Sequence, residues 1–76
     1  MQGHAFSIDV ITGDAVERFW VIGTNEFNAI DVLKKIGLSP KAIIKVRDQV
    51  PDRRAPEFGL DLEAIGTHGR RDGKSN

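Results

Sequence analysis

Apolar and polar residues alternate in the first of two neighbouring segments near the N-terminus, and the two segments together predict a β-hairpin. The first segment spans residues 5–12, and the second, residues 16–22, is rich in β-branched and aromatic side chains. Between them, Gly13 followed by Asp14 suits a two-residue turn with glycine at its first central position. The position of this turn therefore fixes which residues of the two segments lie opposite each other.

This register gives the two faces of the hairpin opposite characters. One face carries apolar pairs, Phe6 with Val21 and Ile8 with Phe19, and we expect it to pack against a helix. The opposite face pairs Ser7 with Trp20, Asp9 with Arg18 and Ile11 with Val16. We expect this second face, with its lone tryptophan, to point toward water.

The segment 25–36 has the features of an amphipathic helix. Thr24 or Asn25 suits its N-cap, and Gly37 suits a left-handed C-terminal cap. An apolar stripe recurs at three-residue steps, widened by two flanking positions: Phe27, Ile30, Leu33 and Ile36, with Ala29 and Val32.

Two interpretations are open for residues 40–48. Pro40 pushes the preceding serine into an extended conformation, yet serine followed by proline also suits the start of a second helix. Residues 43–46 include three β-branched side chains, which favour a strand. We therefore predict a strand here and keep a helix as the alternative.

The last third of the chain has less regular patterns. Residues 50–57, with two prolines and four charged side chains, predict a loop or an extended connector. Residues 58–65 alternate again and predict a last strand. Residues 66–76 contain three glycines and no apolar residue, so we expect a disordered tail after a single domain over residues 4–65.

The resulting order of strand, strand, helix, strand and strand resembles the β-grasp fold of ubiquitin-like proteins. The similarity is closest over residues 35–40, where the predicted helix ends in Gly37, an apolar residue, a serine and Pro40. The resemblance implies an α+β domain with one helix packed across a small mixed sheet. It also implies that partners bind through the exposed face of the sheet.

Sulfur carriers and conjugated ubiquitin-like proteins share this layout, and they end in Gly-Gly, whose carboxylate is activated and transferred. This chain contains no Gly-Gly, and three residues follow Gly73. Sulfur or acyl carrier chemistry is therefore only our third hypothesis for function.

Residues 31–46 are also similar to the helix-turn-helix of bacterial repressors, with Gly37 in the turn. That resemblance implies a nucleic-acid-binding module over residues 29–50, with residues 40–47 in the major groove. However, Leu33 is bulky for a position where that family usually has alanine, and the hairpin would be left with few partners. We therefore keep this module as the alternative to the β-grasp interpretation.

Composition narrows the classes of function. The formal net charge is zero, which argues against a dedicated nucleic-acid binder. There is no cysteine, and His4 and His68 alone cannot fill a tetrahedral metal site, so we expect neither metal nor other cofactor. No nucleophile with a base and no phosphate-binding glycine loop is present, so we predict that the protein is not an enzyme.

The start of the chain lacks the basic residues and apolar stretch of a signal peptide, and no apolar run is long enough to span a membrane. From these features we expect a cytoplasmic protein that does not bind membranes.

We therefore expect a small non-catalytic module that binds a protein partner, or a second copy of itself, through the exposed sheet face or an unpaired strand edge. Tryptophan is common among interface residues that contribute most to binding, so Trp20 is the predicted anchor. The alternative is that residues 51–57 or the tail cover it. The predicted partner-binding residues are Arg18, Trp20, Ile22, Ile43, Lys45 and Arg47.

Overall fold

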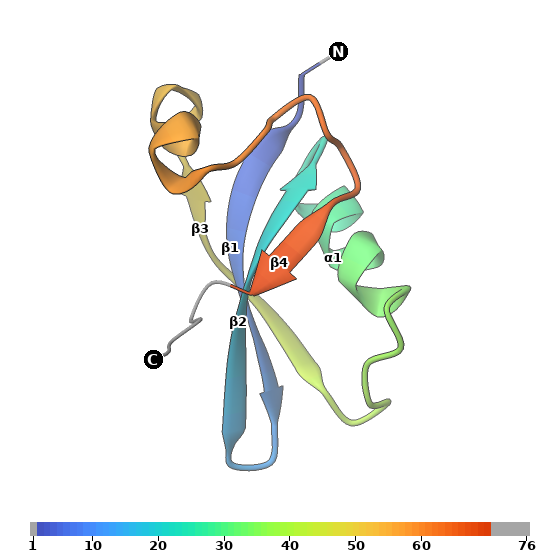
Figure 1. Cartoon of the computed structure of the whole chain (residues 1–76). Helices are drawn as coiled ribbons and strands as arrows, with labels where there is room; N and C mark the ends of the chain where they lie inside the picture. The colour runs from blue at the N-terminus through green and yellow to red at the C-terminus, as the bar shows by residue number, and fades with distance from the viewer. Residues whose placement is uncertain (1, 71–76) are drawn as a thin grey trace.

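The computed structural model describes residues 2–70 and has an α+β fold with one α-helix, one 3-10 helix and four strands (Figure 1). In chain order the elements are β1 (His4–Thr12), β2 (Ala15–Gly23), α1 (Glu26–Lys34), β3 (Ile43–Val50), a 3-10 helix η1 (Asp52–Phe58) and β4 (His68–Arg70). In the described part of the chain, no helix is long and apolar enough to cross a membrane.

The predicted hairpin and its register are confirmed. β1 and β2 pair antiparallel from end to end, with Ile8 opposite Phe19 and Asp9 opposite Arg18. Gly13 begins the turn with φ of 60°, a left-handed conformation that a residue without a Cβ adopts without steric cost. The local turn chemistry therefore determines which side chains share a face.

The predicted helix is present, and Asn25 is its N-cap. The Asn25 side chain accepts a hydrogen bond from the Asn28 backbone N–H at 2.8 Å. The Asn28 side chain in turn accepts from the Thr24 backbone N–H at 2.9 Å, so two donors at this end are satisfied reciprocally. After the helix, Gly37 adopts the predicted left-handed conformation, with φ of 86°.

The predicted apolar stripe of the helix is wrong in detail. Ala29 and Leu33, one turn apart, are the buried residues of α1, whereas Phe27 is 83% exposed and Ile36 is also exposed. Positions three residues apart drift around an α-helix by about 60° at each step, so Phe27 lies almost opposite Ala29 on the helix surface. Ile36 lies beyond the last residue of α1, Lys34.

Past Pro40 the chain forms a strand, which decides between the two interpretations of residues 40–48. β3 pairs antiparallel with β1, with Val46 opposite Ile8 and Ile44 opposite Val10. A helix-turn-helix over residues 29–50 is therefore wrong, because its second helix is absent.

The sheet has the order β3-β1-β2-β4, and each of its three pairings is antiparallel. The expected mixed sheet is not found in residues 2–70. The reason is topological: β3 returns from the helix in the same direction as β2, and it takes the place beside β1. A mixed sheet needs at least one parallel pairing, and the described residues form none.

The face beneath α1 holds the main core. Helix residues Ala29 and Leu33 pack against five buried side chains of the hairpin: Phe6, Ile8, Val10, Phe19 and Val21. β3 adds Ile44 and Val46, which are partly buried against the same cluster. This is the apolar face that alternation predicts.

A β-bulge in β3 changes the alternation. Val46 lies opposite Ile8, but Asp48 lies opposite Ser7, so Arg47 is the extra residue and both charged side chains point to the outer face. Beyond the bulge Val50 also lies on the outer face, opposite Ala5. The bulge therefore directs an apolar side chain away from the helix.

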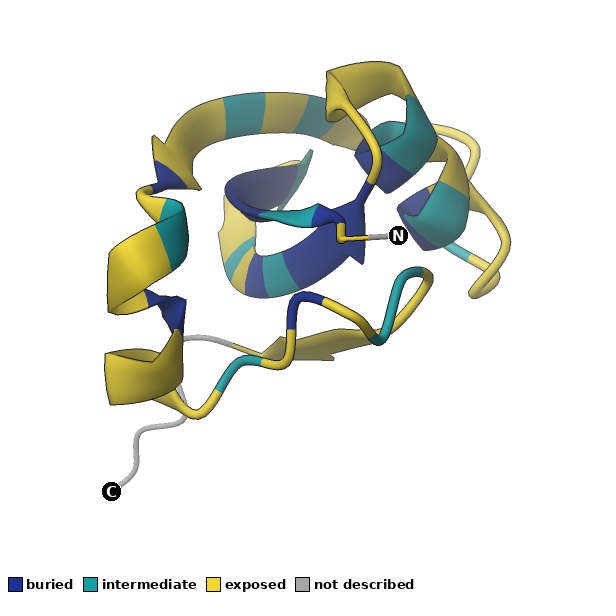
Figure 2. Cartoon of the chain, turned by 90° about the horizontal axis from the view of Figure 1, so that it is seen from above, coloured by how far each residue is buried: buried dark blue, intermediate teal, exposed yellow. Residues whose placement is uncertain are grey.

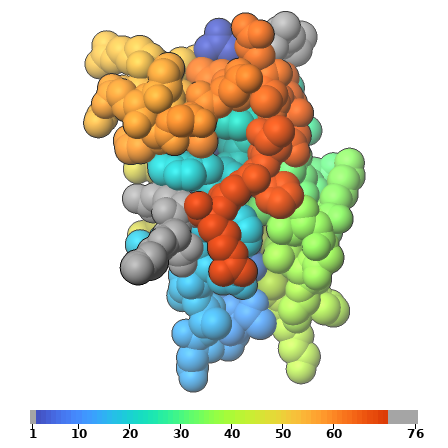
Figure 3. Space-filling view, viewed as in Figure 1, coloured from blue at the N-terminus to red at the C-terminus, as the bar shows by residue number. Residues whose placement is uncertain are grey.

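A second apolar cluster forms around Val50 on the outer face. Its buried members come from three strands, η1 and the following loop: Ala5, Ile22, Val50, Ala55 and Leu62. Figure 2 shows the hairpin between α1 on one side and η1 with the loop on the other, and Figure 3 shows residues of η1 and the loop (orange) over one end of the sheet. The outer face is thus half covered.

The predictions for the last third of the chain are largely wrong. Residues 50–57 are not a loop but the end of β3 and most of η1, and no strand forms over 58–65. Gly59, with φ of 73°, ends η1 in a left-handed conformation that interrupts an extended chain, and Asp61 accepts from the Glu63 N–H to make a turn.

The expected tail is in part ordered. β4 pairs with β2 through His68–Arg70, inside the segment predicted to be disordered. The rest of that segment, residues 71–76, lies outside the described residues, and so does the Gly73 region that bears on carrier chemistry. The ordered domain therefore extends at least five residues beyond the predicted boundary at residue 65.

Candidate functional site

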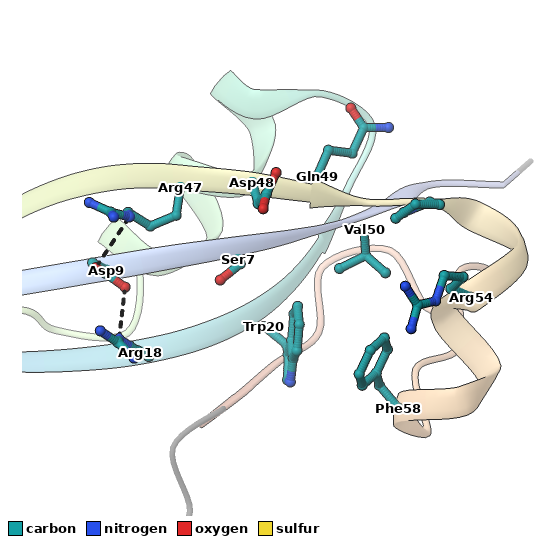
Figure 4. Close-up of a pocket in the computed structure, with 11 residues that line it drawn as sticks. Ser7, Asp9, Arg18, Trp20, Arg47, Asp48, Gln49, Val50, Arg54 and Phe58 are labelled. Carbon is teal, nitrogen blue, oxygen red and sulfur yellow. Dashed lines mark ion pairs between the residues drawn. The ribbon is translucent and has the colours of Figure 1, made fainter.

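A groove of about 660 Å³ lies on the outer face of the sheet, between the strands and η1 (Figure 4). β1, β2 and β3 line its floor, and η1 forms one wall. The residues that line it are Ser7, Asp9, Arg18, Trp20, Arg47, Asp48, Gln49, Val50, Pro51, Arg54 and Phe58.

A buried carboxylate lies between two arginines at one end of the groove. Asp9 is 6% exposed, and its Oδ1 and Oδ2 atoms lie 3.6 Å and 3.7 Å from the Nε atoms of Arg18 and Arg47. Figure 4 shows the two guanidinium groups on either side of the carboxylate. The hairpin register places Arg18 there, and the bulge places Arg47.

The carboxylate of Asp9 is not fully hydrogen-bonded. Both ion pairs are longer than a hydrogen bond, and within residues 2–70 the buried Oδ1 atom has no hydrogen-bond partner. A buried carboxylate needs compensation, which the two positive charges supply only through space. The arginines, whose side chains are about half exposed, are therefore loosely held.

The other end of the groove is aromatic. The ring of Trp20 lies 5.4 Å from that of Phe58, centroid to centroid, with 36° between their planes. The guanidinium carbon of Arg54 is 5.8 Å from the centre of the Phe58 ring. Trp20 is half-buried and Phe58 is 47% exposed, so this end presents apolar surface to the solvent.

Three of the predicted partner-binding residues, Arg18, Trp20 and Arg47, line this groove. Ile43, 62% exposed, and Lys45 are also on the outer face but lie outside it. Ile22 is 3% exposed within the second cluster, so its predicted role as an accessible anchor is wrong.

Both alternatives for Trp20 describe part of the outcome. Phe58, which the sequence placed in the last strand and not in the connector over residues 51–57, packs against Trp20. β4, from the predicted tail, pairs alongside it. Trp20 nevertheless remains half-buried and faces the groove.

Sequence reasoning did not identify Asp9, Arg54 and Phe58 as site residues. The opposite-charge pair of Asp9 and Arg18 was visible in the hairpin register, but nothing local showed that the carboxylate is buried. Arg54 and Phe58 belong to η1, whose position over the sheet depends on the outer cluster. Among the described residues, no group of three or more His, Cys, Asp or Glu side chains is arranged to hold a metal ion.

Comparisons with known proteins give little further information. No protein-family model and no solved structure matches the chain. A stretch of 38 residues, half of the chain, is 47% identical to part of the apolipophorins of Manduca sexta, and it spans 1% of the length of that protein. A match to so small a part of a protein does not show a family.

Proposed function

We propose that this domain is a small non-catalytic module that binds a protein partner through the outer face of its sheet. The observation that carries the proposal is the groove, which places half-exposed aromatic rings beside half-exposed arginines on a rigid sheet. Aromatic and arginine side chains are enriched at the centres of protein interfaces.

The edge of β3 adds to this surface. β3 is at one end of the strand order, so in the described part of the chain its second edge has no neighbouring strand. Four of the groove residues belong to this edge strand: Arg47, Asp48, Gln49 and Val50. A partner in the groove is thus beside backbone groups that can accept an added strand, and a second copy of this chain is one such partner.

Kinship with the ubiquitin-like β-grasp family stays a prediction. A hairpin followed by one helix and a strand beside β1 supports it, whereas the antiparallel direction of β3 differs from the family's mixed sheet. The proposed module acts without metal or other cofactor and in the cytoplasm, as expected from the sequence.

Photo-crosslinking can test this function with a matched pair of positions. Phe58 lines the groove, whereas Phe27 is exposed at the start of α1. We would replace each in turn by p-benzoylphenylalanine, a close relative of phenylalanine, in the cells that naturally contain the protein. We expect defined crosslinked products, to another protein or a second copy, from position 58 only.

A second substitution makes the crosslinking result specific. Arg47→Gln in the same chain should abolish the products formed at position 58, because it removes one of the two arginines at the far end of the groove. Products of equal strength from position 27, or products that survive Arg47→Gln, would place the interface elsewhere and overturn the proposal.

A further inference from the structure

We infer that the groove recognises an extended peptide with one acidic side chain and one large apolar side chain two residues away from it. This inference rests on the proposed function and specifies the chemistry of the partner. It follows from the charges at one end of the groove, the rings at the other end and the distance between them.

The charged end is a binding site for a single carboxylate. Arg18 and Arg47 share one counterion, Asp9, and neither is hydrogen-bonded to it. Their guanidinium groups therefore have donors for an incoming carboxylate, which arginine binds well because of its planar fork geometry. Asp48 also lines the groove, so its three arginines and two aspartates leave an excess of one positive charge.

The aromatic end is a binding site for an apolar side chain. Trp20 and Phe58 are tilted with respect to each other, and the aliphatic side chains of Val50 and Pro51 line the same groove. A phenylalanine or leucine that enters this end removes more apolar surface from water. The guanidinium of Arg54, beside the Phe58 ring, limits how far this surface extends.

The spacing between the two ends matches an extended peptide. The Asp9–Arg18 and Ser7–Trp20 pairs are consecutive pairs on the same face of the hairpin. Two residues of strand correspond to about 7 Å. In an extended peptide, side chains two positions apart point the same way with the same spacing, whereas adjacent side chains point to opposite sides.

The charge balance favours a peptide over single-stranded nucleic acid. Aromatic rings and arginines also bind nucleic acid strands, but those sites follow the phosphate backbone with a continuous row of cations. Here Asp9 and Asp48 lie within the groove itself, and the charged residues that line it have an excess of one positive charge. One carboxylate matches that excess, and a chain of phosphates does not.

The tryptophan provides a direct measurement. Trp20 is the one tryptophan of the chain and lies in the groove, so its fluorescence reports occupancy. The probes are end-blocked peptides with the sequences Gly-Glu-Ser-Phe-Gly and, for the opposite direction, Gly-Phe-Ser-Glu-Gly. The control peptide Gly-Glu-Phe-Ser-Gly has the same composition but places the acidic and aromatic residues next to each other.

We expect at least one of the two spaced peptides to bind more than about tenfold more tightly than the adjacent control, a difference of about 1.4 kcal/mol. Replacing its glutamate by glutamine, or its phenylalanine by alanine, should weaken binding to a similar degree. Equal binding of the spaced and adjacent peptides, or of the glutamate and glutamine peptides, would overturn the inference.

Variants of the protein complete the test. Arg47→Gln should weaken binding of the spaced peptide about tenfold, while Lys45→Gln, the same charge change on the same strand but outside the groove, should leave it within about twofold. Circular dichroism verifies that both variants are folded. Equal losses in the two variants would mean diffuse charge attraction and would contradict a defined site.

An oligothymidine titration tests the other class of ligand. Tighter quenching of Trp20 by a ten-nucleotide oligothymidine than by the spaced peptides would assign the groove to nucleic acid and overturn the inference. If no peptide binds but crosslinking at Phe58 still depends on Arg47, the inferred peptide chemistry fails while the proposed function stands. If both experiments fail, the proposed function fails as well.

Discussion

The two faces of the sheet are covered by different elements and to different extents. The inner face is covered by one regular helix, and its core residues sit at alternating hairpin positions such as Ile8 and Val10. The outer face is covered at one end by η1 and a loop, while its other end holds the buried charge of Asp9. One face is a continuous apolar layer, and the other is divided between a small core and a polar groove.

The difference separates the face that stabilises the fold from the face that we propose binds a partner. On the inner face, the helix over alternating apolar residues leaves Leu33 and Ile8 fully buried. On the outer face, the bulge at Arg47 directs Val50 into the small core and two charged side chains toward the groove. The groove therefore exists because the second cluster covers only part of the face.

The largest expected effect is on the inner face. Leu33→Ala should lower the free energy of unfolding by about 3–5 kcal/mol, because it leaves a cavity between a helix and a sheet that cannot easily collapse. Urea unfolding followed by circular dichroism measures the loss. A loss below about 2 kcal/mol would mean that α1 is not tightly packed on the sheet.

A leucine-to-alanine substitution on the outer face should lower the free energy of unfolding less than Leu33→Ala does. Leu62→Ala removes the same atoms from the second cluster, where Leu62 is 8% exposed and belongs to a loop. We expect a loss of about 2 kcal/mol, because loop residues can move to fill the space. A loss equal to that of Leu33→Ala in the same urea experiment would show that the two faces are equally rigid.

Trp20→Ala should separate stability from recognition. The variant loses the contact with Phe58 and part of a half-buried surface, and we expect a cost of about 1–2 kcal/mol with the fold retained. Circular dichroism measures the fold, and crosslinking from position 58 measures recognition, which should be lost. An unfolded variant would mean that the outer cluster depends on the tryptophan as the inner core depends on Leu33.

The smallest expected effect is at the start of the helix that covers the inner face. Asn25→Ala removes the side-chain acceptor for the Asn28 N–H and should cost about 1 kcal/mol in thermal unfolding. Asn25→Asp keeps an acceptor and is the matched control, expected to retain nearly full stability. Equal losses in both variants would show that the cap does not hold this end of α1.

The hairpin, its register and the helix termini were predictable because each depends on neighbours in sequence. A glycine at the turn decides the pairing of Asp9 with Arg18, and Asn25 reaches its own helix within three residues. The candidate site was predictable in part for the same reason: the register places Arg18 and Trp20 on one face. The alternating pattern could not show that Ile22, which lies on the same face as Arg18 and Trp20, is buried.

The remaining features depend on contacts between distant segments. The alternation over residues 58–65 resembles that of a strand, yet Leu62 and Ile65 reach the second cluster from a loop, because the place beside β2 is taken by His68–Arg70. Likewise the sheet is antiparallel because β3 returns beside β1. No local pattern distinguishes these outcomes.

The amino-acid order by itself determined the hairpin, the helix and the apolar face between them, since turn, cap and periodicity act over a few residues. Only the tertiary structure decided that Asp9 is buried between two arginines, that Phe58 packs on Trp20, and that a groove separates them. The physical reason is that burial on the outer face depends on how far η1 and the loop extend over it. That extent is set by side chains that meet only after the sheet has formed.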